Sequence, residues 1–224
     1  MDQPAYKKSV RREYFEAIVL AVILALFFRT FVIEAFKIPS SSMEDNLLIG
    51  DHILVNKFAY APVMFNWERK LLPIRDVVRT DVIVFKYPED PSRNFIKRVI
   101  ATGNETIEIR DKQVFINGKP IAEPYKFHKA EFFGLTAENF APVQVPSGYY
   151  FAMGDNRDNS KDSRAWGFVP KDYIKGRAFI IYWSFDGPQN VGPSSMGEKI
   201  RSLANVVINF IPKTRWSRFF KIIR

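Results

Sequence analysis

The sequence contains no cysteine and only two histidines, His52 and His128. The missing cysteines exclude disulfides, thiolate nucleophiles, iron–sulfur clusters and cysteine-based zinc sites. Neither histidine lies in a compact motif with carboxylates, so a catalytic metal would have to bind carboxylates alone. Disorder, collagen and coiled coils are disfavoured as well. Of the 224 residues, 47% are hydrophobic and 25% are charged, which is enough for the core of one or two globular domains.

Acidic residues are scarce at the carboxyl end of the chain. Residues 198–224 hold seven lysines and arginines against one acidic residue, and they carry +6 of the formal net charge of +9. Aromatic and aliphatic residues of this basic tail follow an i, i+3, i+4, i+7 spacing: Trp216, Phe219, Phe220 and Ile223. The spacing predicts a basic amphipathic helix over residues 212–224. Such a helix could lie on a membrane surface or dock on the rest of the protein, and the pattern leaves both possibilities open.

Charge is also nearly absent from residues 17–33, where Arg29 is the only charged residue in an apolar run. About 17 residues is the lower limit for crossing a bilayer. A buried core helix is one alternative, and a cleaved signal peptide is another, although Ile33-Glu34-Ala35 is a poor cleavage site. An uncleaved transmembrane anchor fits best. Because lysines and arginines are concentrated in residues 1–16, we expect a cytoplasmic N-terminus and an extracytoplasmic body.

The body, residues 34–197, shows no long helical periodicity. It contains short runs rich in β-branched and aromatic residues, at 53–55, 82–85, 95–100, 106–109, 113–116, 149–153 and 178–183. Turn signals such as Asn117-Gly118 bound several of them. We therefore predict a mainly antiparallel β body, a sandwich or barrel-like fold. Two looser stretches with scattered prolines, near 60–80 and 120–147, are expected to be insertions on this body.

Three polar motifs are candidates for chemistry. Ser40, Ser41 and Ser42 follow a proline, a pattern usual for a loop. Lys97 lies in the middle of an apolar strand pattern, where its amine points either to solvent, the commoner case, or to the interior. The turn-rich loop 154–167 alternates aspartate and arginine. It lacks the flanking helices and final glutamate of a calcium loop, which indicates a rigid ion-paired scaffold instead.

Because cysteine is absent and histidine is rare, a serine nucleophile in this chain needs another residue as its general base. Neutral lysine is the available candidate. Lysine with its ordinary pKa is protonated at neutral pH and cannot accept a proton. It becomes a base when it is desolvated, which an apolar strand would provide. The residue pattern alone leads no further than this.

With these motifs the chain resembles the bacterial type I signal peptidases, the serine–lysine leader peptidases. The resemblance extends over the whole length in the family's order. It comprises the apolar anchor, Ile38–Met43, Gly50–Val55 with Lys57-Phe58, Asp81–Phe85, Ile96–Val99, and Gly154–Ser160 with Asp162–Arg164 and Trp166-Gly167. The last block is the most specific, and the insertions are more like enzymes of Gram-negative bacteria.

The resemblance implies a membrane-anchored serine endopeptidase with antiparallel β-sheets, no metal and no other cofactor. Its implied substrates are secretory preproteins, cut after Ala-x-Ala-like sites at the outer face of the bacterial cytoplasmic membrane, with no role for nucleic acid. The residues it assigns are the nucleophile Ser42, the general base Lys97, the oxyanion-hole donors Ser40 and Ser42, the lysine-orienting Ser160, the ion pair Asp162 and Arg164, and the pocket residues Phe36, Ile38 and Ile96.

Two departures from the family pattern bear on specificity. Ser41 occupies a position often held by glycine, and the proline usual soon after Met43 is absent. Two other functional classes remain open. One is a soluble, self-cleaving serine–lysine protease of the repressor type, which the apolar anchor disfavours. The other is a membrane-anchored β domain that binds peptides without cleaving them.

Overall fold

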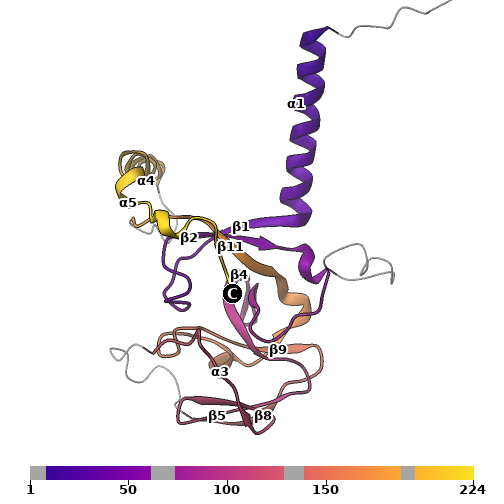
Figure 1. The fold of residues 1–224 in the computed structure, drawn as a ribbon, viewed down its shortest axis with the longest axis vertical. Helices are drawn as coiled ribbons and strands as arrows, with labels where there is room; N and C mark the ends of the chain where they lie inside the picture. The colour runs from indigo at the N-terminus through magenta and orange to yellow at the C-terminus, as the bar shows by residue number, and fades with distance from the viewer. Residues whose placement is uncertain (1–8, 62–73, 129–138, 188–194) are drawn as a thin grey trace, which may run out of the picture.

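A computed structural model describes residues 9–61, 74–128, 139–187 and 195–224. The chain begins with a long helix, α1 (Val10–Phe27), which continues through a π-helical turn, η1 (Phe28–Val32). Figure 1 shows α1 standing away from the rest of the protein. Together the two segments are 23 residues, of which an 18-residue stretch has a mean hydropathy of 2.3, and none of their side chains is buried. The 18 residues of α1 span about 27 Å, close to the thickness of a bilayer core, and η1 extends that length.

The anchor was expected over 17–33, but its boundaries differ from that range. The helix begins earlier, at Val10, and Ile33 is already the first residue of strand β1 (Ile33–Lys37). Ile33, the last residue of the apolar run, pairs with β2 (Asp51–Asn56) along with the rest of β1, which gives its backbone hydrogen-bond partners outside the helix. The loose stretches are described in part, because residues 62–73 and 129–138 lie outside the described ranges.

The body is built from two antiparallel sheets, as the sequence predicts. The larger sheet has the order β1-β2-β11-β3-β4-β9-β10, with β12 also paired to β11. Its further strands are β3 (Val82–Tyr87), β4 (Asp90–Ala101), β9 (Tyr149–Met153), β10 (Val169–Pro170), β11 (Ile174–Ser184) and β12 (Lys221–Ile222). Every strand run that the sequence predicts lies within a strand of one of the two sheets. The second, smaller sheet lies at the end of the molecule far from α1 (Figure 1).

The smaller sheet has the order β7-β6-β5-β8. Its strands are β5 (Thr106–Arg110), β6 (Gln113–Ile116), β7 (Lys119–Pro120) and β8 (Phe140–Gln144). Asp111 and Lys112 connect β5 to β6 with φ angles of 50° and 64°. Two consecutive positive φ values suit the right-handed twist of a tight hairpin, so the predicted hairpin is confirmed. β8 lies within the stretch 120–147 and pairs with β5, so part of that stretch belongs to the sheet.

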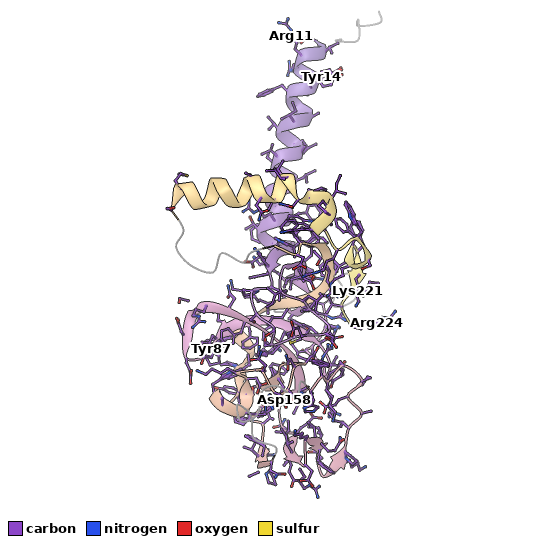
Figure 2. All side chains as sticks on the ribbon, turned by 90° about the vertical axis from the view of Figure 1, so that its left-hand side faces the viewer. Arg11, Tyr14, Tyr87, Asp158, Lys221 and Arg224 are labelled. Carbon is purple, nitrogen blue, oxygen red and sulfur yellow. The ribbon has the colours of Figure 1, made fainter. Side chains whose placement is uncertain are left out.

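The remaining helical segments are short apart from α4. They are η2 (Phe58–Tyr60), α3 (Ser163–Trp166), η3 (Lys171–Tyr173), α4 (Met196–Ile208), α5 (Phe210–Lys213) and η4 (Trp216–Arg218). Figure 2 shows α4 lying across the direction of α1, at the level of the lower end of α1.

The helix predicted over residues 212–224 is wrong. Helical structure ends at Lys213, η4 forms a single turn, and Lys221–Ile222 pair as a strand with β11. Ile223 is 6% exposed, and Arg218 is buried against Asp51. These contacts stabilise the observed conformation more than an amphipathic helix would be stabilised, because they bury an apolar side chain and pair a buried charge. The end of the tail, from Arg218 to Ile223, therefore docks on the body, which is the second of the two possibilities for this segment.

Candidate active site

Ser42 lies in the loop that joins β1 to β2, which we call the nucleophile loop (residues 38–50) after the role that the family resemblance implies for Ser42. Hydrogen bonds close its base, from Ile38 N to Asp51 O at 2.8 Å and from Gly50 N to Ile38 O at 3.0 Å. Met43 and Leu47 are fully buried in the hydrophobic cluster that β2 and β11 also line. The loop is therefore anchored by its apolar residues, and Ser42 is held beside the cluster.

Lys97 lies in the middle of β4, paired in register with Ile83 of β3. Its side chain points inward and is 4% exposed, so the commoner solvent-facing orientation does not apply. The Lys97 amine donates a hydrogen bond to Ser42 Oγ at 2.6 Å. The fold thus brings together two residues that are 55 positions apart in the sequence.

The surroundings of Lys97 favour its neutral form. Burial lowers the pKa of the amine from 10.5 to about 8; the Asp162 and Asp155 carboxylates oppose this shift, and the Arg164 guanidinium adds to it. With a pKa near 8, about a tenth of the amines are neutral at pH 7. A lysine in this state can accept a proton from the hydroxyl that it contacts.

Gly154 brings the loop after β9 directly against the nucleophile loop. A Cβ at this position would overlap the Ser160 hydroxyl and the Ser42 carbonyl oxygen. Ser160 is buried there, but it forms no hydrogen bond of ordinary geometry with the described residues, Lys97 included. It does lie near enough to Asp162 to help lower the pKa of that carboxyl. Only glycine allows Ser42 and Ser160 to pack this closely.

Asp162 and Arg164 form the expected ion pair. The Arg164 guanidinium donates to both carboxylate oxygens, at 2.8 and 2.7 Å. Burial would raise the pKa of Asp162, but hydrogen bonds from Arg164 and from the backbone N–H of Gly154 keep it lowered. Asp162 therefore stays ionised, and it ties the two ends of the loop together.

The other aspartates of this loop are also paired. Asp155 binds the Arg98 guanidinium through two hydrogen bonds of 2.8 and 2.6 Å, and both side chains are completely buried. Asp158 lies 3.0 Å from His128 Nδ1. The prediction of an ion-paired scaffold is confirmed by these contacts, which account for every carboxylate of the loop that resembled a calcium ligand.

The structure adds residues that sequence reasoning missed. Asn156 bonds the nucleophile loop through its backbone N–H to Ser42 O and through its side chain to Ser41 O, each at 3.2 Å. Asn159 donates to Ser41 Oγ at 2.8 Å. The side chain of Ser41, in the place of a glycine, thus has a partner. The signal for these contacts was the density of asparagine in loop 154–160, but its partners lie more than 100 residues away.

The remaining predicted residues lie around Ser42. Ser40 is exposed in the same turn, two residues before Ser42. Ile38 is 2% exposed within the cluster beside the loop, and Phe36 and Ile96 are partly buried and pack against that cluster. The three apolar residues therefore come from β1, the nucleophile loop and β4 and share one cluster.

The chain is similar to known signal peptidases. The family model described as signal peptidase, peptidase S26, matches residues 11–183. The signal peptidase I of Pseudomonas fluorescens is 36% identical over 219 residues, covering 82% of this chain and 76% of that protein. The signal peptidase I T of Bacillus subtilis is 36% identical over 185 residues, covering 80% and 89%. A solved signal peptidase I from Enterococcus faecalis is 34% identical, with a TM-score of 0.40, covering 46% of this chain and 97% of that one.

The family match covers well over half of the chain, and the relatives align along most of their own length. The serine-bearing loop and the buried lysine lie within the matched region, as do the strands apart from β12 and the last residue of β11. The chain belongs to the peptidase S26 family of type I signal peptidases.

Proposed function

We propose that this protein is a serine endopeptidase in which Ser42 is the nucleophile and Lys97 the general base. The observation that carries the proposal is the 2.6 Å hydrogen bond between a buried lysine with a lowered pKa and a serine hydroxyl. Neutral Lys97 takes the hydroxyl proton as Ser42 Oγ attacks the scissile carbonyl. The lysine then protonates the leaving amine, and water hydrolyses the acyl-enzyme with the same base.

The oxyanion that forms in this attack needs two donors. We assign them to the backbone N–H of Ser42 and the hydroxyl of Ser40, which share one turn. Each such donor typically contributes about 3 kcal/mol to transition-state stabilisation. The bonds from Asn156 to the carbonyls of Ser41 and Ser42 hold the backbone of this turn, which supports a fixed direction for the Ser42 N–H.

Ser160 and the Asp162–Arg164 pair are assigned to the orientation of the lysine. Ser160 is buried beside Gly154, and the carboxylate of Asp162 is the largest favourable charge acting on Lys97. We assign to Ser160 a hydrogen bond to the lysine amine in the substrate complex. Such a bond would aim the amine at Ser42 while the ion pair keeps the loop in place.

The substrate, in this proposal, is a secretory preprotein that binds as an added strand along residues 36–40. β1 is the last strand of the larger sheet and pairs with β2 alone among the described strands, which leaves its other edge open. Main-chain bonds would set the register, as in other strand-addition complexes. Phe36, Ile38 and Ile96 would line small pockets, which select alanine-sized residues because larger ones would overpack.

We propose that α1 and η1 span the bacterial cytoplasmic membrane with the N-terminus inside and the β body outside. α4 lies across α1, and large apolar residues near the junction of α4 and α5 are strongly exposed: Val207, Ile208 and Ile211. A helix with this orientation would lie along the outer membrane surface. The active site would then be held where signal-peptide cleavage sites emerge.

The test is cleavage of a preprotein carrying an Ala-x-Ala site by the full-length protein in detergent. Ser42→Ala, Lys97→Ala and Lys97→Arg should each abolish cleavage, the last because guanidinium remains charged. The exposed residues Ser147 and Lys86 supply matched controls, and Ser147→Ala and Lys86→Ala should cleave normally. Near-normal cleavage by an active-site variant would refute the dyad. Binding without cleavage, or cleavage only of the protein itself, would favour one of the two alternative functions.

A further inference from the structure

The last residues of the chain contact both the loop that carries Ser42 and the strand that carries Lys97. We call residues 215–224 the C-terminal clasp. In Figure 1 the carboxyl end of the chain lies over β4, the strand that carries Lys97. Arg98 Nη1 donates a hydrogen bond of 2.7 Å to a main-chain oxygen of Arg224. Ile223 is buried in the same cluster as Met43, the residue after the nucleophile.

Arg218 joins the clasp to the nucleophile loop. Its guanidinium pairs with Asp51 at 3.0 and 2.5 Å and donates a further bond of 2.8 Å to the main-chain carbonyl of Asn46. Asp51 also accepts from the backbone N–H of Leu48, so the same carboxylate fixes the loop and the arginine. Arg218 is 9% exposed and Asp51 is fully buried. A pair this deeply buried has little freedom to rearrange.

Asn46 links the clasp to the strand that carries Lys97. Its side-chain amide donates to Asp155 at 2.8 Å, and Asp155 pairs with Arg98, the neighbour of Lys97 in β4. The contacts therefore form a closed ring: Arg218, Asn46, Asp155, Arg98 and Arg224, whose first and last members both belong to the clasp. One side of the ring is the loop that holds Ser42, and the other is the strand that holds Lys97.

From this ring we infer that Arg218 is a positioning residue, which fixes the distance between Ser42 Oγ and Lys97 Nζ through Asn46. The inference rests on the proposed function of the dyad. A displacement of about 1 Å between reacting groups can lower a catalytic rate about 100-fold. A change at Arg218 should therefore lower the rate of the chemical step while the edge of β1, where substrate would bind, stays as it is.

The test compares Arg218→Lys with the wild type, both as full-length protein in detergent, on a peptide with an Ala-x-Ala site. Lysine keeps the charge but cannot bind Asp51 and Asn46 through a planar fork. We expect kcat to fall about 10- to 100-fold with KM within about twofold of the wild type. We also expect the rise of rate with pH to move to higher pH, because a loosened site lets water reach Lys97. The matched control is Lys221→Gln, an exposed position of the clasp outside the ring, which should leave kcat unchanged.

A second variant, Asn46→Ala, breaks the ring without touching the Arg218–Asp51 pair. It keeps the inference testable if Arg218→Lys does not fold. In the double variant the two effects on kcat should be far from additive, because both changes act on one connection. Rates are expressed per folded molecule from the amplitude of thermal unfolding.

Unchanged kcat and an unchanged pH profile in both folded variants would overturn the positioning role while leaving the dyad intact. Additive effects of the two changes on kcat would also count against it. The proposed function fails separately, if Ser42→Ala still cleaves the peptide in the same assay.

Discussion

The burial of Lys97 should make the protein less stable near neutral pH than it would be without that charge. Burial depresses the pKa of the amine from 10.5 in the unfolded chain to about 8 in the fold. The unfolded state therefore binds the extra proton, and stability rises with pH between these two values. The penalty is fully present below about pH 8 and is lost as the pH rises through 10.5. A difference of about 2.5 units corresponds to about 3 kcal/mol at pH 7 and about 1 kcal/mol at pH 10.

Lys97→Met tests this reasoning, because methionine has a similar length and no charge. The variant loses one hydrogen bond to Ser42, worth about 1 kcal/mol, and escapes the penalty of about 3 kcal/mol. It should be inactive and about 2 kcal/mol more stable than the wild type at pH 7, with the difference disappearing by pH 10. The assay is urea unfolding at both pH values, with residues 1–28 removed from both proteins. A variant less stable than the wild type at pH 7, or a difference that does not change with pH, would show that the amine is charged and paired in the fold.

Further predictions concern the scaffold and the topology. Gly154→Ala should lower cleavage about 100-fold, because the added Cβ overlaps Ser160 and the Ser42 carbonyl; activity close to wild type would contradict the packing described. Arg98→Met should destabilise the fold by about 3–5 kcal/mol in urea unfolding, since it leaves Asp155 buried and unpaired, whereas a loss below about 1 kcal/mol would mean that Asp155 finds another partner. Protease added outside spheroplasts should digest the body and leave a small anchored fragment, and a fully protected body would reverse the proposed orientation.

The strands could be predicted from the sequence because the β-branched and aromatic residues that favour a strand lie within each strand itself. The hairpin at 106–116 shows both the β-branched runs and the short connection that such a turn needs. The end of the anchor was harder to predict, since Phe31-Val32-Ile33 is apolar enough for a membrane helix and β-branched enough for a strand. The pairing with β2 decides between the two, and that partner lies across a loop.

The site was predictable only through the family resemblance. Periodicity alone could not say whether Lys97 faced solvent, and nothing local connects it to Ser42. The buried pair of Arg98 and Asp155 and the contacts of Asn46 were missed for the same reason, because each joins residues more than 50 positions apart. The tail was misread since its helical spacing is real, but burial of Ile223 and the pairing of residues 221–222 with β11 outweigh it.

The dependence of cleavage on pH tests the central claim most directly, namely that a neutral lysine activates the serine. The measurement is kcat/KM of the full-length protein on a peptide with an Ala-x-Ala site, from pH 6 to pH 11. Because protonated Lys97 cannot act as a base, the rate should rise about tenfold per pH unit below the pKa and level off above about pH 8. A rate that is independent of pH over this range, or one that rises only near the ordinary lysine pKa of 10.5, would contradict the account.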